Sequence, residues 1–499
     1  MAFQVSPGVL VQERDLTRII PAVSTAIGAI AISANKGPLD EIVSISSEQE
    51  LVDTFGKPDS TNFEYFFSAA NFLQYSNSLR VVRATQTNAV NASTSGTGVL
   101  IKNTDDWTNN YASGGQAGNA TFVAREAGTD GNNLQVSTCP NAAAYEQEGA
   151  TTVNDASTAV GDTVVVAASG AALNVGDIIS FSTTAATNDY DDGEQYRVTN
   201  ISTNDITIVQ HPRGTGGLKR ALTDGSNIRR RWKYYDAVDG APGTSTYVSE
   251  RNGANDEIHV VVIDEDGGIS GVPGTILETF SKLSKASDAK DPQGNDNYYP
   301  NVIYTKSEYI YWTKHHASGS NWGNAASGTT FTAVNTPTLE TMSGGSNGST
   351  VTTGQIKTAY DKFADSETVD IGLIIAGPCD STHIENMISI AEARKDCVVF
   401  ASPERSDVVN VTNSNTQKSN VVSFFSTISS TSYASFDSGY KYMYDRYNDV
   451  YRFVPLNGDM AGLCARTDLI ADSWFSPAGF NRGIVRGAVK LAFNPTKAQ

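Results

Sequence analysis

Cysteine is scarce in this 499-residue sequence, and its four cysteines lie far apart, at Cys139, Cys379, Cys397 and Cys464. No two of them have the CxxC spacing, or the spacing to histidine, that zinc sites and redox motifs use. The sequence therefore predicts neither a metal site nor a disulfide framework, and we expect reduced thiols.

Long hydrophobic runs and basic residues are also few. The N-terminus lacks the charged and apolar regions of a signal peptide, and apolar runs such as 371–376 have the length of a strand, not of a membrane span. The 54 acidic residues outnumber the 36 basic ones, which gives a formal charge of −18. This balance disfavours binding to nucleic-acid phosphates, which depends on Lys and Arg. We expect a soluble protein, made in a cytoplasm, with no bound nucleic acid and no stable membrane insertion.

A catalytic set of residues is missing as well. Gly243-Thr244-Ser245 superficially resembles a subtilisin nucleophile motif, but no histidine is followed by glycine and nothing places a base beside Ser245. The glycine-containing turn at 124–134 lacks the Lys-Ser/Thr of a phosphate-binding loop. The basic and aromatic run at 228–235 could bind nucleic acid, with a solvated edge or a contact to acidic protein as the alternative. We predict that the chain is not an enzyme and needs no cofactor.

The chain is long enough for several domains, and its patterns change along its length. We expect a multidomain α/β plus β fold. Its parts are an N-terminal extended arm (1–24), a first part of an α/β scaffold (25–88), a β-rich middle domain (89–140 and 236–344), an inserted peripheral β-barrel or sandwich (141–235) and a second part of the scaffold (345–499).

Two of these parts have clear patterns. Regular β/α alternation after Gly345 predicts a mainly parallel sheet with covering helices. Short strands separated by turns predict the inserted β domain. In the middle domain, Ile276, Phe280 and Leu283 follow helical spacing, and 304–312 scans as a half-exposed strand.

The N-terminal arm is predicted from alternation. Phe3, Val5, Val9 and Val11 fall on one face of an extended segment that Pro7-Gly8 punctuates. An ordinary first strand of the scaffold has the same pattern, so both interpretations remain open at this point.

The stretch 439–483 concentrates aromatic residues between prolines and glycines. Such density provides apolar area for a core or an interface. We predict a small-residue helix over 461–468, with Trp474, Phe475 and Pro477 anchoring the segment on the α/β core.

The same stretch resembles a motif of tail sheath proteins from contractile-tailed bacteriophages. The residues in register are Pro455, Gly462, Arg466, Thr467, Asp468, Trp474, Pro477, Asn481 and Arg482. Ser6-Pro7-Gly8-Val9, the block 72–84 and the turn Ser343-Gly344-Gly345 are also similar to that family. Sheath proteins continue past the position that matches 494–496, so the resemblance implies that a C-terminal part is lacking.

The resemblance implies a structural role. The α/β core would be subtilisin-like but non-catalytic, and the arm at Phe3–Val11 would join a neighbour's sheet. The chain would polymerise with itself as stacked rings in a helical sheath around the tail tube protein, with baseplate and tail terminator proteins at its ends. Assembled in the host bacterial cytoplasm and carried in the virion, it would contract to drive the tube through the host envelope. There are two alternatives to a phage-tail function. The chain could form the sheath of a tailocin or contractile injection system, or it could be a hydrolase with its site on the α/β core.

Overall fold

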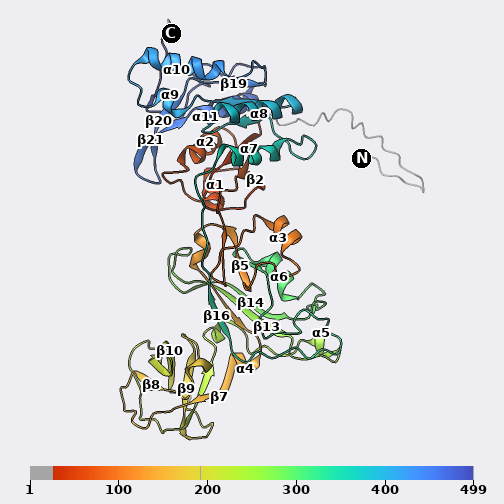
Figure 1. Ribbon diagram of the computed structural model, residues 1–499, viewed down its shortest axis with the longest axis vertical. Helices are drawn as coiled ribbons and strands as arrows, with labels where there is room; N and C mark the ends of the chain where they lie inside the picture. The colour runs from red at the N-terminus through yellow and green to blue at the C-terminus, as the bar shows by residue number, and fades with distance from the viewer. Residues whose placement is uncertain (1–25, 192, 498–499) are drawn as a thin grey trace, which may run out of the picture.

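The computed structural model describes residues 26–191 and 193–497. Figure 1 shows three bodies along the longest axis of the molecule, an α/β unit, a β-rich unit and a peripheral sheet. The predicted arm at 1–24 lies outside the described residues. Its role in contacts between subunits therefore stays a prediction, for Phe3, Val5, Pro7, Gly8, Val9 and Val11.

The α/β unit is built on a six-stranded sheet. Its order is β19 (Ala434–Phe436), β18 (Val398–Ala401), β17 (Leu373–Ile375), β1 (Gly28–Ile32), β3 (Leu79–Arg83) and β2 (Ile42–Ile45). Every neighbouring pair is parallel except β2 with β3. The β/α alternation after Gly345 is thus confirmed as part of a mainly parallel sheet, to which the N-terminal strands contribute the other half.

Helices cover both faces of this sheet. One core packs α2 (Phe63–Leu73) and α11 (Asn457–Ile470) on one face, and another packs α7 (Thr353–Tyr360) and α8 (Ser381–Arg394) on the other. Successive residues of β17 point into opposite cores, as alternation in a strand requires. The unit also contains α1 (Glu48–Phe55), η4 (Asp361–Phe363), α9 (Arg405–Val408), α10 (Ser414–Ser426), and a sheet of β21 (Val450–Pro455), β20 (Tyr440–Asp445) and β22 (Lys490–Leu491).

The β-rich unit has two sheets around one core. The first has the order β14 (Thr275–Ser284), β13 (Glu257–Asp264), β6 (Leu134–Cys139) and β16 (Thr338–Thr341), and the second β15 (Ile310–Trp312), β5 (Phe122–Ala127) and β4 (Asn91–Ser93). Short helices surround them: α3 (Thr104–Asn110), η1 (Asp130–Asn133), α4 (Ala142–Tyr145), η3 (Tyr235–Ala237), α5 (Thr246–Ser249) and α6 (Tyr299–Lys306).

Two predictions for this unit are wrong. The segment 276–283 is strand β14, and irregularities in its pairing with β13 break the two-residue alternation, so that Phe280 and Leu283 both reach the core at a helix-like spacing. The segment 304–312 is the end of helix α6 followed by a short strand. Pro300 in the first turn of α6 is a helix-start signal that the strand prediction overlooked.

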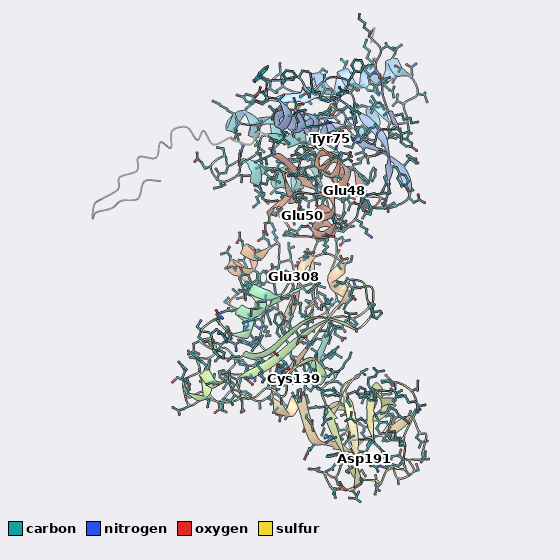
Figure 2. The ribbon with its side chains drawn as sticks, turned by 180° about the vertical axis from the view of Figure 1, so that it is seen from behind. Glu48, Glu50, Tyr75, Cys139, Asp191 and Glu308 are labelled. Carbon is teal, nitrogen blue, oxygen red and sulfur yellow. The ribbon has the colours of Figure 1, made fainter. Side chains whose placement is uncertain are left out.

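The peripheral sheet has six strands in the order β7 (Glu146–Thr152), β12 (Ser226–Arg231), β9 (Ile178–Ala185), β10 (Gln195–Ser202), β11 (Asp205–His211) and β8 (Val164–Val166). A 3-10 turn, η2 (Gly170–Ala172), lies between β8 and β9. An isolated bridge joins Val153 to Ala167, beyond the ends of the two edge strands. Figure 2 places Asp191 in this body and Cys139 near its junction with the β-rich unit.

Residues of the basic and aromatic run form that junction. The Arg230 side chain is fully buried and donates to the carbonyl oxygens of Ala143 at 2.7 Å and Asn335 at 2.8 Å. The Trp232 indole donates to Ser137 Oγ at 2.8 Å and packs in a core with Val261 of the β-rich unit. These side chains therefore tie two bodies of the same chain together, a role that neither nucleic-acid binding nor its stated alternatives describe.

Two antiparallel segments and a buried arginine connect the α/β unit to the β-rich unit. Val90 and Ser346 exchange backbone hydrogen bonds of 3.0 Å between the two segments. Arg83, fully buried at the end of β3, donates to the carbonyl oxygens of Gly37 at 2.7 Å and Ala127 at 2.9 Å. Because Gly37 and Ala127 belong to different bodies, the guanidinium clamps the connection between them.

Candidate functional site: an assembly surface

Five of the nine motif residues of 439–483 lie on helix α11 or at the end of the strand before it. Pro455 ends β21, and Gly462 faces the chain just after α2, where an added Cβ would lie 2.5 Å from a ring carbon of Tyr75. Only glycine allows α11 to approach so closely. Thr467 is buried, and its hydroxyl donates to Leu463 O at 2.8 Å. Arg466 and Asp468 are half-buried on the last turn of the helix. The predicted helix over 461–468 is confirmed as part of α11.

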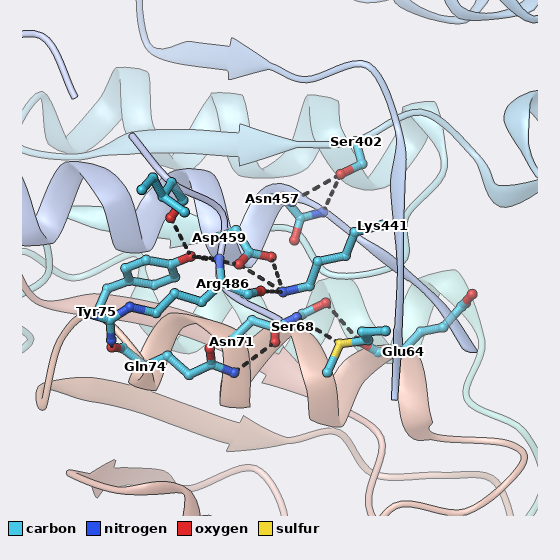
Figure 3. Close-up of polar contacts among 12 residues, drawn as sticks. Glu64, Ser68, Asn71, Gln74, Tyr75, Ser402, Lys441, Asn457, Asp459 and Arg486 are labelled. Carbon is cyan, nitrogen blue, oxygen red and sulfur yellow. Dashed lines mark hydrogen bonds and ion pairs between the residues drawn. The ribbon is translucent and has the colours of Figure 1, made fainter. Parts of the chain in front are cut away.

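A buried ion pair lies beneath this helix. Lys441 Nζ of β20 is 2.9 Å from both oxygens of Asp459 on α11, and both side chains are fully buried. The Tyr75 hydroxyl donates to Asp459 Oδ1 at 3.1 Å (Figure 3). Burial raises the pKa of Asp459 and lowers the pKa of Lys441, while the partner's charge opposes each shift. The charged forms of Lys441 and Asp459 are therefore stabilised by each other, because burial disfavours each of them alone.

The same pair fixes the chain near Arg486, far along the sequence. Lys441 Nζ also donates to Arg486 O at 2.9 Å, and the Arg486 N–H donates to the Tyr75 hydroxyl at 2.7 Å. The Arg486 guanidinium lies 5.0 Å from the centre of the Tyr75 ring and bonds to Gln74 O. Figure 3 shows Lys441 of β20 and Asp459 of α11 meeting Tyr75, just after α2, and Arg486, in the segment after α11. The network holds the segment after α11 on the surface of the α/β unit.

That segment is largely apolar and exposed. We define the C-terminal apolar face as Leu469, Ile470, Trp474, Phe475, Phe480, Ile484, Val489 and Leu491. Trp474 is 79% exposed and Phe480 98% exposed. The prediction that Trp474 anchors the segment in a core is therefore wrong, because no element among the described residues covers the indole. Pro477 alone of the three predicted anchors is half-buried, lining a cleft of about 310 Å³ beside α11 and β19.

The remaining motif residues lie in the same exposed loop. Asn481 is exposed, and Arg482 donates to Ser476 O at 2.8 Å with its guanidinium 4.6 Å from the centre of the Phe475 ring. These contacts shape the loop without burying its aromatic residues. Large exposed apolar areas of this kind mark interaction surfaces.

Aromatic residues also cover the outer side of the β20–β21 hairpin. Tyr442 pairs with Phe453 at a ring separation of 4.7 Å, and Tyr444 with Tyr451 at 5.2 Å. Tyr444 and Tyr451 are about half exposed, at 45% and 53%. The hairpin therefore extends the exposed apolar area next to the segment after α11.

The carboxyl ends of the parallel strands, where α/β enzymes place ligands, hold a closed polar network instead. Ser402 Oγ donates to Asp437 at 2.8 Å and accepts from Asn457, whose side-chain amide also pairs with the backbone of Gly377. Burial raises the pKa of Asp437 to about 7. The serine has a carboxylate and an amide as partners, and no histidine is among them, so this set does not form the serine–histidine pair of a hydrolase.

The other suspected catalytic serine has a structural role. Ser245 accepts from Val248 N as the N-cap of α5 and donates to the buried Asp256 at 2.8 Å. Within residues 26–191 and 193–497, no cluster of His, Cys, Asp and Glu is arranged to hold a metal ion. Over the same ranges, the helices are too short or too polar to span a bilayer.

The structure brings together motifs that lie far apart in the sequence. Asn132, in the turn at 124–134, donates to Gly345 O at 3.1 Å and accepts from Gly345 N at 2.8 Å. This reciprocal pair joins the turn to the Gly344-Gly345 motif, next to the connection between the two larger bodies. The residues that sequence reasoning missed are Lys441, Asp459 and Arg83, since isolated charged residues carry no signal of burial.

Comparison with known proteins gives a consistent result. Residues 25–84 match the family model of the tail sheath protein Gp18 domain III N-terminal region, and residues 349–499 match that of the phage tail sheath protein central domain. The tail sheath protein of Enterobacteria phage T4 is 30% identical over 99% of this chain and 77% of its own length. That of Vibrio phage KVP40 is 27% identical over 99% of this chain and 78% of its own length.

Two solved structures are similar at lower identity. A sheath tail protein from Listeria innocua aligns with a TM-score of 0.37 at 9% identity, over 88% of this chain and 56% of that one. A sheath tail protein from Desulfitobacterium hafniense aligns with a TM-score of 0.38 at 9% identity, over 98% of this chain and 68% of that one.

Proposed function

Because this chain belongs to the tail sheath proteins of contractile-tailed bacteriophages, we infer that it is a structural subunit of a phage tail. Copies of the chain polymerise as a helical sheath around the tail tube and contract to drive the tube through the host envelope. The observation that carries this inference is the 30% identity with the T4 tail sheath protein over 99% of the chain. The protein is a component of the virion tail.

The exposed side chains of the α/β unit support self-association. The C-terminal apolar face and the β20–β21 hairpin expose aromatic and aliphatic side chains next to one another. Burial of apolar area is the main favourable term in most protein association, at roughly 25 cal/mol per Å² removed from water. This area thus provides a free-energy source for assembly that requires no nucleotide or cofactor.

Contraction requires two alternative sets of contacts between copies, of which the contracted set has the lower free energy. The clamp at Arg83 and the junction at Arg230 hold the three bodies of one copy together, so we expect them to move as a unit. The contacts that change during contraction are then those between copies. The other proposed partners are the tail tube, baseplate and tail terminator proteins.

Finer features of the fold are proposals as well. The mainly parallel sheet of the α/β unit corresponds to the core of the family, which is subtilisin-like in fold but non-catalytic. The bridge between Val153 and Ala167 supports a peripheral sheet that curls toward a small barrel. The N-terminal arm, through Phe3, Val5, Val9 and Val11, adds to a sheet edge of a neighbouring copy.

Sedimentation velocity over a range of protein concentrations tests the function, with and without purified tail tube. We expect oligomers that grow with concentration and co-sediment with the tube. A chain that stays monomeric and never binds the tube would overturn the proposal.

A further inference from the structure

Asparagine followed by glycine occurs three times in this chain, at Asn252-Gly253, Asn347-Gly348 and Asn457-Gly458. In such a pair the backbone nitrogen of the glycine can attack the side-chain amide carbon of the asparagine, because glycine has no side chain to hinder the approach. The attack requires that this nitrogen leave its hydrogen bond and that the asparagine amide turn toward it. The structure distinguishes the three pairs on these two requirements.

The pair Asn457-Gly458 is locked in the core of the α/β unit. Asn457 is fully buried, and its amide nitrogen donates to Gly377 O at 2.8 Å and to Ser402 Oγ at 3.1 Å. Its Oδ1 accepts from Gly377 N at 3.2 Å. Gly458 packs so closely on α2 that an added Cβ would lie 2.2 Å from Ser68 O. Because all these contacts must open before the attack, we expect this pair to react most slowly.

The pair Asn347-Gly348 is restrained at the connection between the two larger bodies. Asn347 Oδ1 accepts from Thr129 N at 2.9 Å, and Gly348 N donates to Ser346 Oγ at 3.1 Å. An added Cβ on Gly348 would lie 2.7 Å from Thr87 O, so its backbone has little room to move. Partners therefore hold both the amide and the attacking nitrogen.

The pair Asn252-Gly253 lies in a turn after α5, on the far side of the β-rich unit from the peripheral sheet (Figure 1). Asn252 is exposed, and its side chain forms no hydrogen bond with any residue that the structure describes. Its backbone is left-handed, with a φ of 58°. Gly253 N donates to Val248 O at 3.0 Å. The amide is thus free to turn, and the attacking nitrogen has one backbone hydrogen bond to leave.

We propose that Asn252 is a deamidation site, which reacts before Asn347 and Asn457. Gly253 N forms a bond to Asn252 Cγ and gives up its proton, while the bond from Cγ to Nδ2 breaks and the amide nitrogen leaves with that proton as ammonia. Water then adds to one carbonyl carbon of the resulting succinimide ring and breaks that carbon's bond to the ring nitrogen. The product is aspartate or isoaspartate, and neither step involves an oxidant or a cofactor.

The isoaspartate product has an additional carbon in its backbone, at a turn that is tightly packed. A Cβ added at Gly253 would lie 2.6 Å from Ala326 O and 2.7 Å from Thr329 O. Beside it, Ala254 N donates to Thr329 O at 3.0 Å and Phe331 N donates to Ala254 O at 2.9 Å. A longer backbone does not fit between these contacts, so the modification loosens the loop that contains Ala326, Thr329 and Phe331.

Peptide mapping by mass spectrometry of the full folded chain, incubated at mildly alkaline pH, tests the site. We expect deamidation at Asn252 to be faster than at Asn347, and at least about tenfold faster than at Asn457, since a surface turn opens at a much smaller free-energy cost than a core. The same chain in denaturant should deamidate at all three pairs at similar rates. Faster reaction at Asn347 or Asn457 in the folded chain would overturn the proposal. So would an unmodified Asn252 after a time in which the unfolded chain has reacted at all three pairs.

Two variants separate the modification from its effect on the loop. Asn252→Gly removes the amide and suits the left-handed backbone, so it should abolish the signal at this pair without changing the unfolding midpoint. Asn252→Asp has the new charge but a backbone of normal length. Hydrogen exchange of peptides covering 326–331 should rise with the isoaspartate content of the parent chain and stay at the level of the fresh parent chain in Asn252→Asp. Exchange that is independent of isoaspartate content would refute the loosening.

Discussion

Removing one partner of the Lys441–Asp459 ion pair should loosen the α/β unit strongly. Both side chains are fully buried, so neither charge regains water when its partner is removed. Breaking a buried pair from one side costs about 3–5 kcal/mol. We therefore expect Lys441→Met to lower the free energy of local opening around β20 and α11 by that amount.

Hydrogen exchange measured by mass spectrometry reports this opening locally, which suits a chain of several bodies. Peptides that cover 440–470 should exchange between about a hundredfold and a few thousandfold faster, since each 1.4 kcal/mol is a factor of ten. The double variant Lys441→Met/Asp459→Leu should regain most of the protection, because an apolar pair of similar volume often replaces a buried ion pair at little cost.

The matched control is Lys490→Met, on the neighbouring strand β22. Lys490 is exposed, so its loss should change protection of the same peptides by no more than about 0.5 kcal/mol. A change below about 1 kcal/mol for Lys441→Met would refute the reasoning, since it is far smaller than the loss expected for a buried partner.

Three further predictions concern other parts of the chain. Deleting 147–230, with the flanking residues joined by a short Gly/Ser linker, should leave a folded remainder with an unchanged unfolding midpoint for the two larger bodies. Deleting the wider range 141–235 also removes Trp232 from the junction and should give a product that aggregates. Equal solubility of the two deletion variants would mean that the boundary of the peripheral domain lies elsewhere. Gly462→Ala should destabilise α11 because its Cβ would lie 2.5 Å from the tyrosine ring, whereas Gly354→Ala, with nothing within 4 Å, should be neutral or stabilising in chemical denaturation; the reverse order would contradict the close helix contact. Burial raises the pKa of Asp177 to about 7 from 3.8, so the folded state binds the proton more tightly and the stability of the peripheral sheet should fall as pH rises from about 4 to about 7. Asp177→Asn should flatten that dependence, measured as unfolding free energy against pH, and an unchanged slope would rule out this carboxyl as its cause.

Much of the α/β unit could be predicted from the sequence because its strands and helices alternate with ordinary caps. In α1, Ser47 accepts from Glu50 N at 3.2 Å and Gly56 ends the helix at positive φ, as a serine N-cap and a C-terminal glycine commonly do. The pairing of β1 with β17, in which Gly28 lies opposite Leu373, could not be predicted. Local patterns say that a strand forms, but the partner is decided by packing across the sheet.

The assembly surface shows a different limit. The density of aromatic residues predicts that side chains of 439–483 are buried, but it does not say whether the residues that bury them belong to the same chain. Tyr440 is buried within the chain, whereas Trp474 in the same stretch is exposed. Strand β14 shows the third limit, since its irregular pairing imitates helical spacing and only the neighbouring strand reveals it.

The central claim is that this chain forms the sheath of a contractile tail, and immunogold electron microscopy of the phage that encodes it tests this claim most directly. Antibodies raised against the purified chain should label the tail along its whole length, in both extended and contracted particles. The labelled region should shorten and widen when the tail contracts. Label confined to the capsid, the baseplate or the exposed tube, with an unlabelled sheath, would contradict the account.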